Sequence, residues 1–409
     1  MSQRKEARPP MTLRRRTKQD DDFPLPDEIV LEILARLPVK SLLRFRCVCQ
    51  TWYSFITNPN FISTHLLCYN NNNNNNHDDD GYVIHMPRSP SLSQICTVAS
   101  DRTFETISEF RIPFTLQYGY LQLGGSCNGI LCVADYWTFA TMDVYLWNPS
   151  IRIFKRLPNT CLPQLPTVAL GFGYDSQNND YKVVRISWID PKPMSPSEVQ
   201  VYSLSSDSWK RVELGISWMP KFNFTLTFPF VSGHLHWMIT KIEGGGGGQK
   251  TKRRCTDMIL SLDVNSEKFK ELPLPDEEGK CIKEGLASFK GKLALIRYGI
   301  GAQPYSTLCS IWVMTEYGVL DSWNKLCVLP IENPSNFIGT FTNYGLLLVQ
   351  KWSWLVSTNS ELGRNHKSVL IDLETLHEKE ISNQVDFRLD LAAYMESLAL
   401  LDGANVVSY

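Results

Sequence analysis

The 409-residue sequence has almost no net charge, because 41 lysines and arginines oppose 42 aspartates and glutamates and leave a formal charge of -1. A chain without a global field has no general attraction for nucleic acid or for an anionic membrane. No apolar run approaches the roughly 20 residues that span a bilayer, and no apolar stretch follows the basic N-terminal residues as it does in a secretory signal. We therefore expect no nucleic-acid or membrane partner, and a location in the cytoplasm, the nucleus or both.

The sequence also lacks the motifs of common metal and cofactor sites. Its eleven cysteines are scattered without CxxC spacing, which indicates reduced core residues rather than zinc ligands or disulfides. There is no P-loop, and Gly171-Phe172-Gly173 lacks the third glycine of a dinucleotide-binding turn. His234 and His236 share one face of a strand, but no acid or cysteine stands at ligand spacing. We predict no cofactor and no metal.

Three segments of biased composition divide the chain: residues 1–22, residues 68–81 and the glycine run 244–248. The first is a basic tail that we expect to be disordered, with an arginine cluster at 14–16 compatible with nuclear import. The second is rich in asparagine and aspartate and is expected to be a linker. The glycine run precedes a basic stretch, 250–254, and is expected to be an exposed loop. The linker separates a helical region, residues 23–67, from a strand-rich region, residues 82–402.

The helical region begins with a strongly amphipathic pattern. Pro26 sets φ for a first helical turn, and Ile29, Ile33 and Leu37 follow in one row at four-residue spacing. Pro38 cannot continue this helix. A second helical series and a last short helix follow in the order Leu42, Phe45, Val48, Trp52, Ile56, Phe61, Ile62 and Leu66.

A unit of about 45 residues buries too little surface to cover so many large apolar side chains by itself. We predict that a second protein covers the remainder. The alternative is that these helices simply pack on the following domain, but the low-complexity linker argues against tight packing.

The strand-rich region contains a repeated hairpin. Residues 144–158, 199–213 and 259–273 each form a strand, a polar turn and a strand, with two large side chains seven residues apart: Trp147 and Phe154, Tyr202 and Trp209, Leu262 and Phe269. A fourth copy, 310–326, aligns Trp312 with Trp323 across a longer turn, and a weaker fifth covers 369–381.

Hairpins with glycine at the bend alternate with these copies, as in SCNGILCVA and SFKGKLALIRY. Two hairpins in each period of 54 to 60 residues give the four strands of a β-propeller blade. We expect about six blades, the last formed by strands around 82–110 and closed by a C-terminal strand near 394–401. The alternative is a large β-sandwich, which needs no fixed period.

A catalytic centre is not visible in the sequence. Ser126 follows two glycines, but Asn128 stands where a nucleophile elbow has its second glycine, so we expect a turn residue. No general base with an orienting carboxylate can be assembled from sequence proximity. We predict no catalytic residue. An enzyme whose site forms at the centre of the propeller from distant residues is the alternative.

The segment LPDEIVLEILARLPVKSLLRFRCVCQTWYSFITNPNFISTHL, residues 25–66, resembles an F-box. The segments GSCNGILC, LWNPSIRIFKRLP, GFGYDSQNNDYKVVRI, VQVYSLSSDSWKRV and GHLHWMI resemble the F-box-associated (type 1, kelch-like) domain of the large plant F-box family. The implied fold is an α+β multidomain chain with a helical F-box followed by a mostly-β, kelch-like propeller. Gln50 and Phe55 depart from the family's usual lysine and leucine.

The resemblance implies that one set of residues forms or supports a surface for a Skp-family adaptor: Leu25, Pro26, Ile29, Ile33, Leu37, Pro38, Val39, Leu42, Cys47, Val48 and Trp52. The adaptor would connect the chain to a cullin and a RING subunit, so that a target protein on the propeller is ubiquitinated and degraded. Ligase substrate receptor is thus the expected function. A scaffold that binds the adaptor without a ligase is the remaining alternative, and the target is not readable from the sequence.

Overall fold

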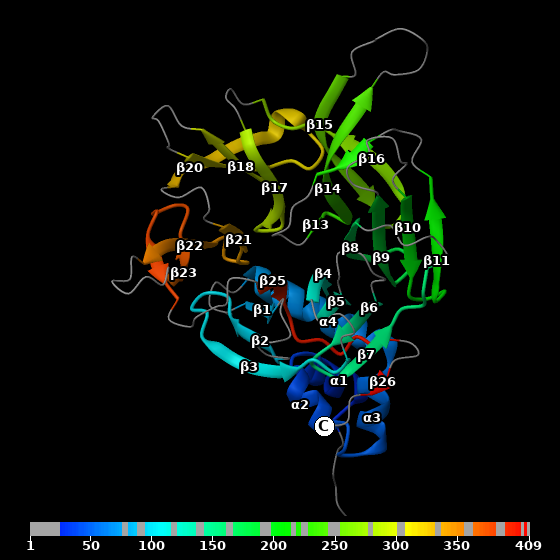
Figure 1. Cartoon of the computed structure of the whole chain (residues 1–409). Coiled ribbons are helices and arrows are strands. Elements are labelled where there is room, and N and C mark those ends of the chain that lie inside the picture. Colours follow the sequence, from blue (N-terminus) through cyan, green and yellow to red (C-terminus); the bar gives the residue numbers. More distant parts are fainter. Residues whose placement is uncertain are drawn as a thin grey trace, which may run out of the picture.

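A computed structural model of the chain describes residues 25–75, 81–87, 95–115, 121–135, 143–160, 167–188, 198–213, 218–221, 228–243, 254–276, 281–300, 307–331, 337–355, 363–381, 389–401 and 405–406. The predicted tail 1–22, the glycine run and residues 250–253 lie outside these ranges. Four helices are followed by six small antiparallel sheets set around a ring (Figure 1). The expected helical module and propeller are both confirmed. None of the described helices combines the length and apolarity that crossing a bilayer requires.

The helices are α1 (Asp27–Ala35), α2 (Val39–Phe45), α3 (Gln50–Thr57) and α4 (Pro59–Asn75). Pro26 and Pro38 are the N-caps of α1 and α2, where a missing backbone N–H costs nothing. Asp27 and Glu28 place negative charge at the positive end of α1. The sequence predicted a short helix around residues 61–66, but the corresponding helix, α4, is the longest of the four described helices. It continues into the asparagine run, because extending an existing helix adds one hydrogen bond per residue without a new nucleation cost.

Blades 1 to 3 are described from the ring centre outwards. Blade 1 contains β25 (Leu389–Tyr394), β1 (Tyr82–Pro87), β2 (Ile95–Ser100) and β3 (Thr106–Arg111). Blade 2 contains β4 (Leu121–Cys127), β5 (Ile130–Asp135), β6 (Asp143–Asn148), β7 (Ile153–Arg156) and β26 (Asn405–Val406). Blade 3 contains β8 (Thr167–Asp175), β9 (Asp180–Trp188), β10 (Glu198–Ser203) and β11 (Ser208–Val212).

Blades 4 to 6 complete the ring. In blade 4, β12 (Trp218–Pro220) and β13 (Phe230–Val231) both pair with β14 (His234–Glu243), followed by β15 (Arg254–Asp263) and β16 (Lys268–Leu272). Blade 5 contains β17 (Cys281–Phe289), β18 (Lys292–Ile300), β19 (Thr307–Met314) and β20 (Trp323–Ile331), with a 3-10 helix, η1 (Leu320–Ser322), before β20. Blade 6 contains β21 (Phe337–Phe341), β22 (Leu347–Leu355), β23 (Gly363–Ile371) and β24 (Glu378–Glu380).

The C-terminal strand closes the ring. β25 pairs antiparallel with β1, from Tyr82 opposite Tyr394 to Pro87 opposite Leu389. Closure by a C-terminal strand is confirmed, but the strand is 389–394 and not 394–401. Residues 395–401 leave the sheet because they turn towards blade 2 and the helices. The strand-bearing part also extends beyond residue 402, since β26 pairs with β7.

The seven-residue spacing places the large side chains of each repeated hairpin directly opposite one another. Trp147 faces Phe154, Tyr202 faces Trp209 and Leu262 faces Phe269 in the strand registers. Such cross-strand pairs stabilise a sheet by about 0.2–1 kcal/mol each. The fourth copy differs from its predicted alignment: Trp323 is opposite Met314, and Trp312 is opposite Lys325. A β-bulge beside Trp312 shifts the register there.

The glycine hairpins join the two inner strands of the blades. Between β4 and β5, Asn128 and Gly129 have φ of 50° and 76°, the conformation that a two-residue type I′ turn requires. The turns at 232–233 and 290–291 have positive φ at both positions as well. The prediction that Ser126 is a turn residue is wrong: Ser126 lies in strand β4, because the chain bends only at Asn128 and Gly129.

Each pair of neighbouring blades encloses its own apolar cluster, and the helices have a separate one. Between blades 2 and 3, for example, Leu146 and Val183 are completely buried. Burial of one such side chain contributes about 1.5–3 kcal/mol. The ring is therefore held together by contacts between blades as well as by hydrogen bonds within them.

Candidate adaptor-binding and target-binding surfaces

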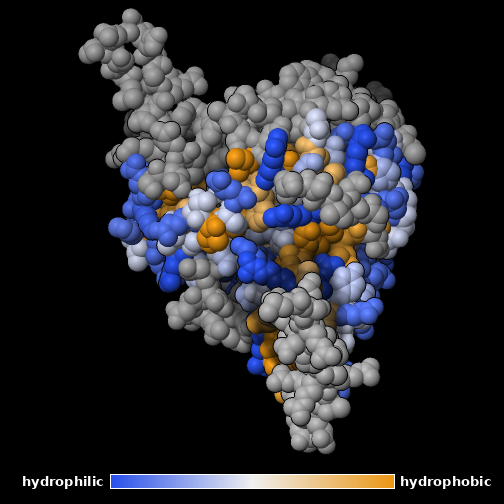
Figure 2. All heavy atoms as spheres, turned by 90° about the horizontal axis from the view of Figure 1, so that it is seen from below, coloured by the Kyte–Doolittle hydropathy of each residue, from blue (hydrophilic) through white to orange (hydrophobic). Residues whose placement is uncertain are grey.

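Helix α1 presents a row of large apolar side chains to solvent. Leu25, Ile29 and Ile33 are 59%, 43% and 49% exposed. Their four-residue spacing places Ile29 and Ile33 on one side of the helix. The backbone N–H groups of Ile29 and Val30 both donate to the carbonyl oxygen of Pro26, so the row is regular from its first turn. Figure 2 views the molecule from the end at which the helices lie in Figure 1, and apolar residues reach the surface there in patches between hydrophilic ones.

The opposite side of α1 belongs to a closed core. Leu34 and Ala35 are buried with Ile56 of α3. Val39 and Leu42, which the resemblance assigned to the adaptor surface, are 2% and 0% exposed in this same core. They cannot contact a partner and can only support the surface. Leu398 and Ile151 of the propeller complete this core, so the helices do pack on the following domain, against the expectation drawn from the linker. The exposed row remains uncovered after this packing.

The other residues of the predicted surface are at least partly accessible. Pro26, Pro38, Cys47 and Val48 are exposed, and Val48 reaches 61%. Leu37 and Trp52 are half-buried. Trp52 packs edge-on against Phe45, with ring centroids 5.2 Å apart.

Two further residues of the helical unit, one exposed and one buried, were not singled out from the sequence. Tyr53 is 50% exposed and lies under the guanidinium of Arg46 at 5.3 Å. The sequence analysis missed it, although its place next to Trp52 on a helix indicates a different, outward direction. His65 of α4 is buried, and its Nε2 lies 2.9 Å from the carbonyl oxygen of Leu37. Burial lowers the pKa of His65, so the neutral ring donates to Leu37 and holds the end of α1 in place.

The connections of the blades differ between the two ends of the ring. At one end, the first-to-second strand turns are short, as at 128–129, 232–233 and 290–291. At the other end, the second and third strands of every blade are separated by six to ten residues. The turn carrying Ile151, between β6 and β7, packs against the helical unit, so the helices lie at the short-turn end. The strand ends with the longer connections point away from it.

A cavity of about 150 Å³ lies at the centre of the ring near the short turns. All six blades line it, through residues such as Ser126, Phe172, Phe230, Phe341 and Ala392. Among its described lining residues, Lys290 is the one with a titratable side chain, and its Nζ is 3.7 Å from a carboxylate oxygen of Glu374. Ser126 therefore has no general base beside it within the described lining.

The histidines that suggested a metal pair have structural partners instead. His236 is fully buried, its Nδ1 donates to the carbonyl oxygen of Pro229 at 3.1 Å, and its Nε2 accepts from the Tyr317 hydroxyl at 2.8 Å. Burial lowers the pKa of His236 to about 4, which keeps the ring neutral. Tyr317 belongs to blade 5 and also contacts Ser261 at 2.7 Å. In the part of the chain that the structure describes, no group of three or more potential ligands could hold a metal ion.

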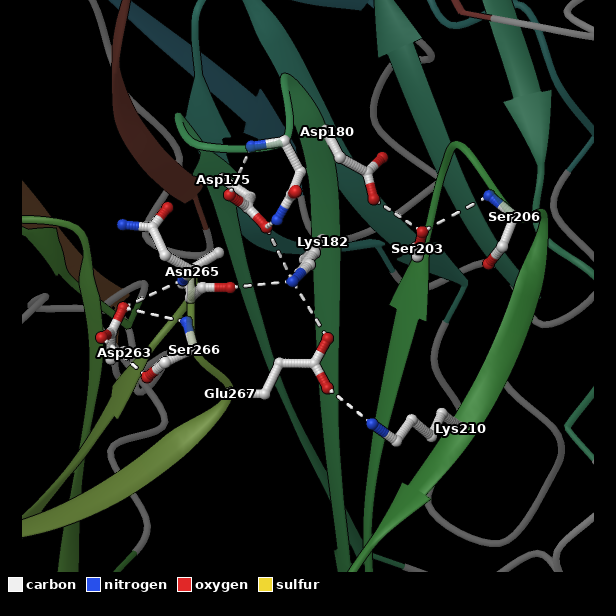
Figure 3. A network of polar contacts seen from close by, with 12 residues as sticks. Asp175, Asp180, Lys182, Ser203, Ser206, Lys210, Asp263, Asn265, Ser266 and Glu267 are labelled. Carbon is white, nitrogen blue, oxygen red and sulfur yellow. Dashed lines mark hydrogen bonds and ion pairs between the residues drawn. The ribbon is translucent and has the colours of Figure 1, made fainter.

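A buried ionic network connects blades 3 and 4 (Figure 3). The Lys182 ammonium lies 2.9 Å from Asp175, 3.0 Å from Glu267 and 3.0 Å from the carbonyl oxygen of Val264. Burial would raise the pKa of Asp175, but hydrogen bonds from Asn178 and Lys182 hold it below its usual value. Every member is satisfied, so the network acts as a clamp between blades and not as a reactive centre.

Comparison with family models and with sequence relatives agrees with this architecture. Residues 24–64 match the family model of the F-box domain, and residues 45–349 match that of the F-box associated beta propeller domain. An F-box/kelch-repeat protein of Arabidopsis thaliana is 30% identical over 352 residues, which cover 84% of this chain and 90% of that protein. An F-box protein of the same plant is 27% identical over 378 residues, covering 83% and 79%. Among solved structures, TolB from Acinetobacter baumannii is similar with a TM-score of 0.46 and 10% identity, covering 82% of this chain and 72% of that one.

Proposed function

Because the chain belongs to the F-box proteins with an F-box-associated β-propeller, we propose that it is a substrate-recognition subunit of a Skp–cullin–F-box ubiquitin ligase. Its F-box docks on a Skp-family adaptor, which connects it to the cullin and RING subunits. Its propeller holds a target protein for ubiquitination and degradation. The observation that carries the proposal is the exposed row Leu25, Ile29 and Ile33, which neither the other helices nor the propeller covers.

An exposed apolar row of this kind is costly in water and gains free energy when a partner covers it, at about 25 cal/mol per Å² of apolar surface removed from water. A few large side chains commonly supply most of the binding energy of an interface. Leu25 before α1, Ile29 and Ile33 on α1, and Val48 before α3 are such side chains. Val39 and Leu42 contribute by holding these helices in position.

The target is proposed to bind at the end of the ring where the longer connections leave the blades. This end is opposite to the one on which the F-box lies, so the adaptor and the target do not compete for space. Specificity in such scaffolds commonly resides in loops carried by a rigid framework. The glycine run 244–248 and residues 250–253 of the basic stretch fall between β14 and β15, within one of these connections.

The chain acts by positioning and performs no chemistry of its own. Holding a target near the ubiquitin-carrying subunits converts an encounter in solution into a local reaction. The proposed location is the cytoplasm, the nucleus or both. A propeller enzyme is less well supported, because the central cavity offers no base beside Ser126 in its described lining.

The test is binding of the purified full chain to a purified Skp-family adaptor. Ile29→Asp and Ile33→Asp each place a charge in the docking row and are expected to weaken binding by about 2 kcal/mol or more. Val328→Asp is the matched control, because Val328 on β20 is 43% exposed, as is Ile29. Adaptor binding that survives both F-box variants would remove the basis of the proposal. Addition of the cullin then separates a ligase subunit from a scaffold that binds the adaptor alone.

A further inference from the structure

The chain leaves the innermost strand of blade 1 at Tyr394 and continues as an extended segment, residues 395–401, which we call the C-terminal strap. Its side chains alternate between two neighbours. Ala399 and Leu401 are buried in the cluster between blades 2 and 3. Leu398, which directly precedes Ala399, is 3% exposed and lies in the core of the F-box. One short segment thus enters two separate cores from its two sides.

The strap is fixed to the propeller by a set of buried hydrogen bonds. Asn148 of β6 is fully buried, and its Nδ2 donates to the carbonyl oxygens of both Ser397 and Ala399 at 3.0 Å. Ser150 accepts from the backbone N–H of Ser397 at 3.2 Å, and its hydroxyl lies 2.7 Å from that of Tyr394. A polar residue at the end of β6 and another in the β6–β7 turn therefore hold the strap along its length.

The turn between β4 and β5 leaves room for the strap because it has a glycine at the point of contact. Gly129 has φ of 76°, and a Cβ at this position would lie 2.3 Å from the Cβ of Ser397 and 2.6 Å from the carbonyl oxygen of Met395. No side chain fits there without moving the strap. Glu396 of the strap also faces the F-box: burial raises its pKa, and the positive charge of Lys40 on α2 opposes that rise.

We infer that the C-terminal strap is a rigid joint that fixes the F-box on the propeller, with Leu398 as its positioning residue. The distance between the adaptor and the target-binding end is then set by this joint and not by the sequence that connects α4 to β1. The same segment directly follows the strand that closes the ring, so the joint is anchored on a closed ring. The significance of the joint for ubiquitin transfer rests on the proposed function, but the joint itself does not.

The test is hydrogen exchange of the full chain, followed at backbone amides of residues 34–45. Leu398→Asp removes the apolar contact. Asn148→Asp places a carboxylate oxygen against two carbonyl oxygens and displaces the strap without changing any residue of the F-box. Both are expected to accelerate exchange about tenfold or more, because the F-box opens locally once it loses the strap. Leu400→Asp is the matched control, since Leu400 is 46% exposed, and it is expected to leave exchange unchanged.

Exchange in β1 and β25 monitors ring closure in the same experiment and is expected to stay slow in all three variants. With the adaptor bound, small-angle scattering of Asn148→Asp is expected to give a larger radius of gyration than the unmodified complex. Unchanged F-box exchange in both Leu398→Asp and Asn148→Asp, or equal acceleration in Leu400→Asp, would overturn the inference. An unmodified chain that fails to bind the adaptor refutes the proposed function only, because the exchange measurement needs no adaptor.

Discussion

Lys182 of blade 3 and Glu267 of blade 4 form a 3.0 Å ion pair across the boundary between the blades. The Lys182 side chain is 8% exposed, and its second partner, Asp175, is completely buried. A buried ammonium between two carboxylates is held by good geometry, and its removal leaves the buried carboxylate of Asp175 without a cationic partner, whereas Glu267 keeps Lys210. Stability of the folded chain is therefore expected to be sensitive to removal of the Lys182 ammonium.

Lys182→Met is expected to lower the free energy of unfolding by about 3–5 kcal/mol, measured by urea denaturation. The control is Lys210→Met, because Lys210 bonds to the same Glu267 at 3.2 Å from a side chain that is 74% exposed. A surface pair of this type contributes at most about 1 kcal/mol. Equal losses in the two variants would show that burial of the network is irrelevant to stability.

The pKa of Asp101 in blade 1 is raised in the folded chain, whereas the pKa of most carboxylates in folded proteins is lowered. Its contribution to folding stability therefore decreases as the pH rises. Burial raises its pKa to about 6, although a hydrogen bond from the backbone N–H of Asn343 partly opposes the rise. The folded chain therefore retains a proton on Asp101 between about pH 4 and pH 6, where the unfolded chain has released it. The contribution to stability is present below this window and decreases as the pH rises through it, by up to about 3 kcal/mol.

Asp101→Asn removes this titration. The stability of the variant relative to the unmodified chain is expected to improve from pH 4 to pH 7, measured by denaturant unfolding at several pH values. A difference that stays constant across that range would mean that Asp101 is ionised in the folded chain at low pH.

Two residues of the predicted adaptor surface are expected to separate binding from folding. Leu42→Ala should cost about 2–5 kcal/mol of stability, because Leu42 is completely buried and its truncation leaves a cavity. Ile33→Ala should change stability by no more than about 0.5 kcal/mol, because Ile33 is 49% exposed. Thermal unfolding and adaptor binding are measured on both. A binding defect in Ile33→Ala with an unchanged unfolding temperature is expected, and a large loss of stability would contradict the assignment.

The glycines of Gly171-Phe172-Gly173 are required for the packing of blade 3 against blade 4. A Cβ on Gly171 would lie 2.7 Å from Cζ2 of Trp237 and 3.1 Å from Cδ1 of Leu235. Gly171→Ala is expected to cost about 1–3 kcal/mol through overpacking. Trp237→Leu in the same chain makes room for the new methyl group, so the double variant should lose less than the sum of the single losses. Additive losses would indicate that the two residues do not compete for space.

The sequence alone was sufficient for the features that repeat locally. The seven-residue spacing of Tyr202 and Trp209 corresponds to a cross-strand pair, and the bend at Asn128-Gly129 has the positive φ values of a tight hairpin. The helical row of Ile29 and Ile33 was readable for the same reason, because the period of an isolated helix fixes which side chains share a face. The six-bladed ring and the F-box both follow from such short-range patterns.

The tertiary structure alone decided which of these side chains remain accessible and how the two domains are joined. Val39 and Leu42 carry the same apolar pattern as Ile33, yet only the packing of the helices buries them. The bond from Asn148 to Ala399 spans 251 residues, so no local period signals it. Hydrophobic period specifies the elements because it arises from backbone geometry, whereas burial and the strap depend on contacts between segments that meet only after the ring has closed.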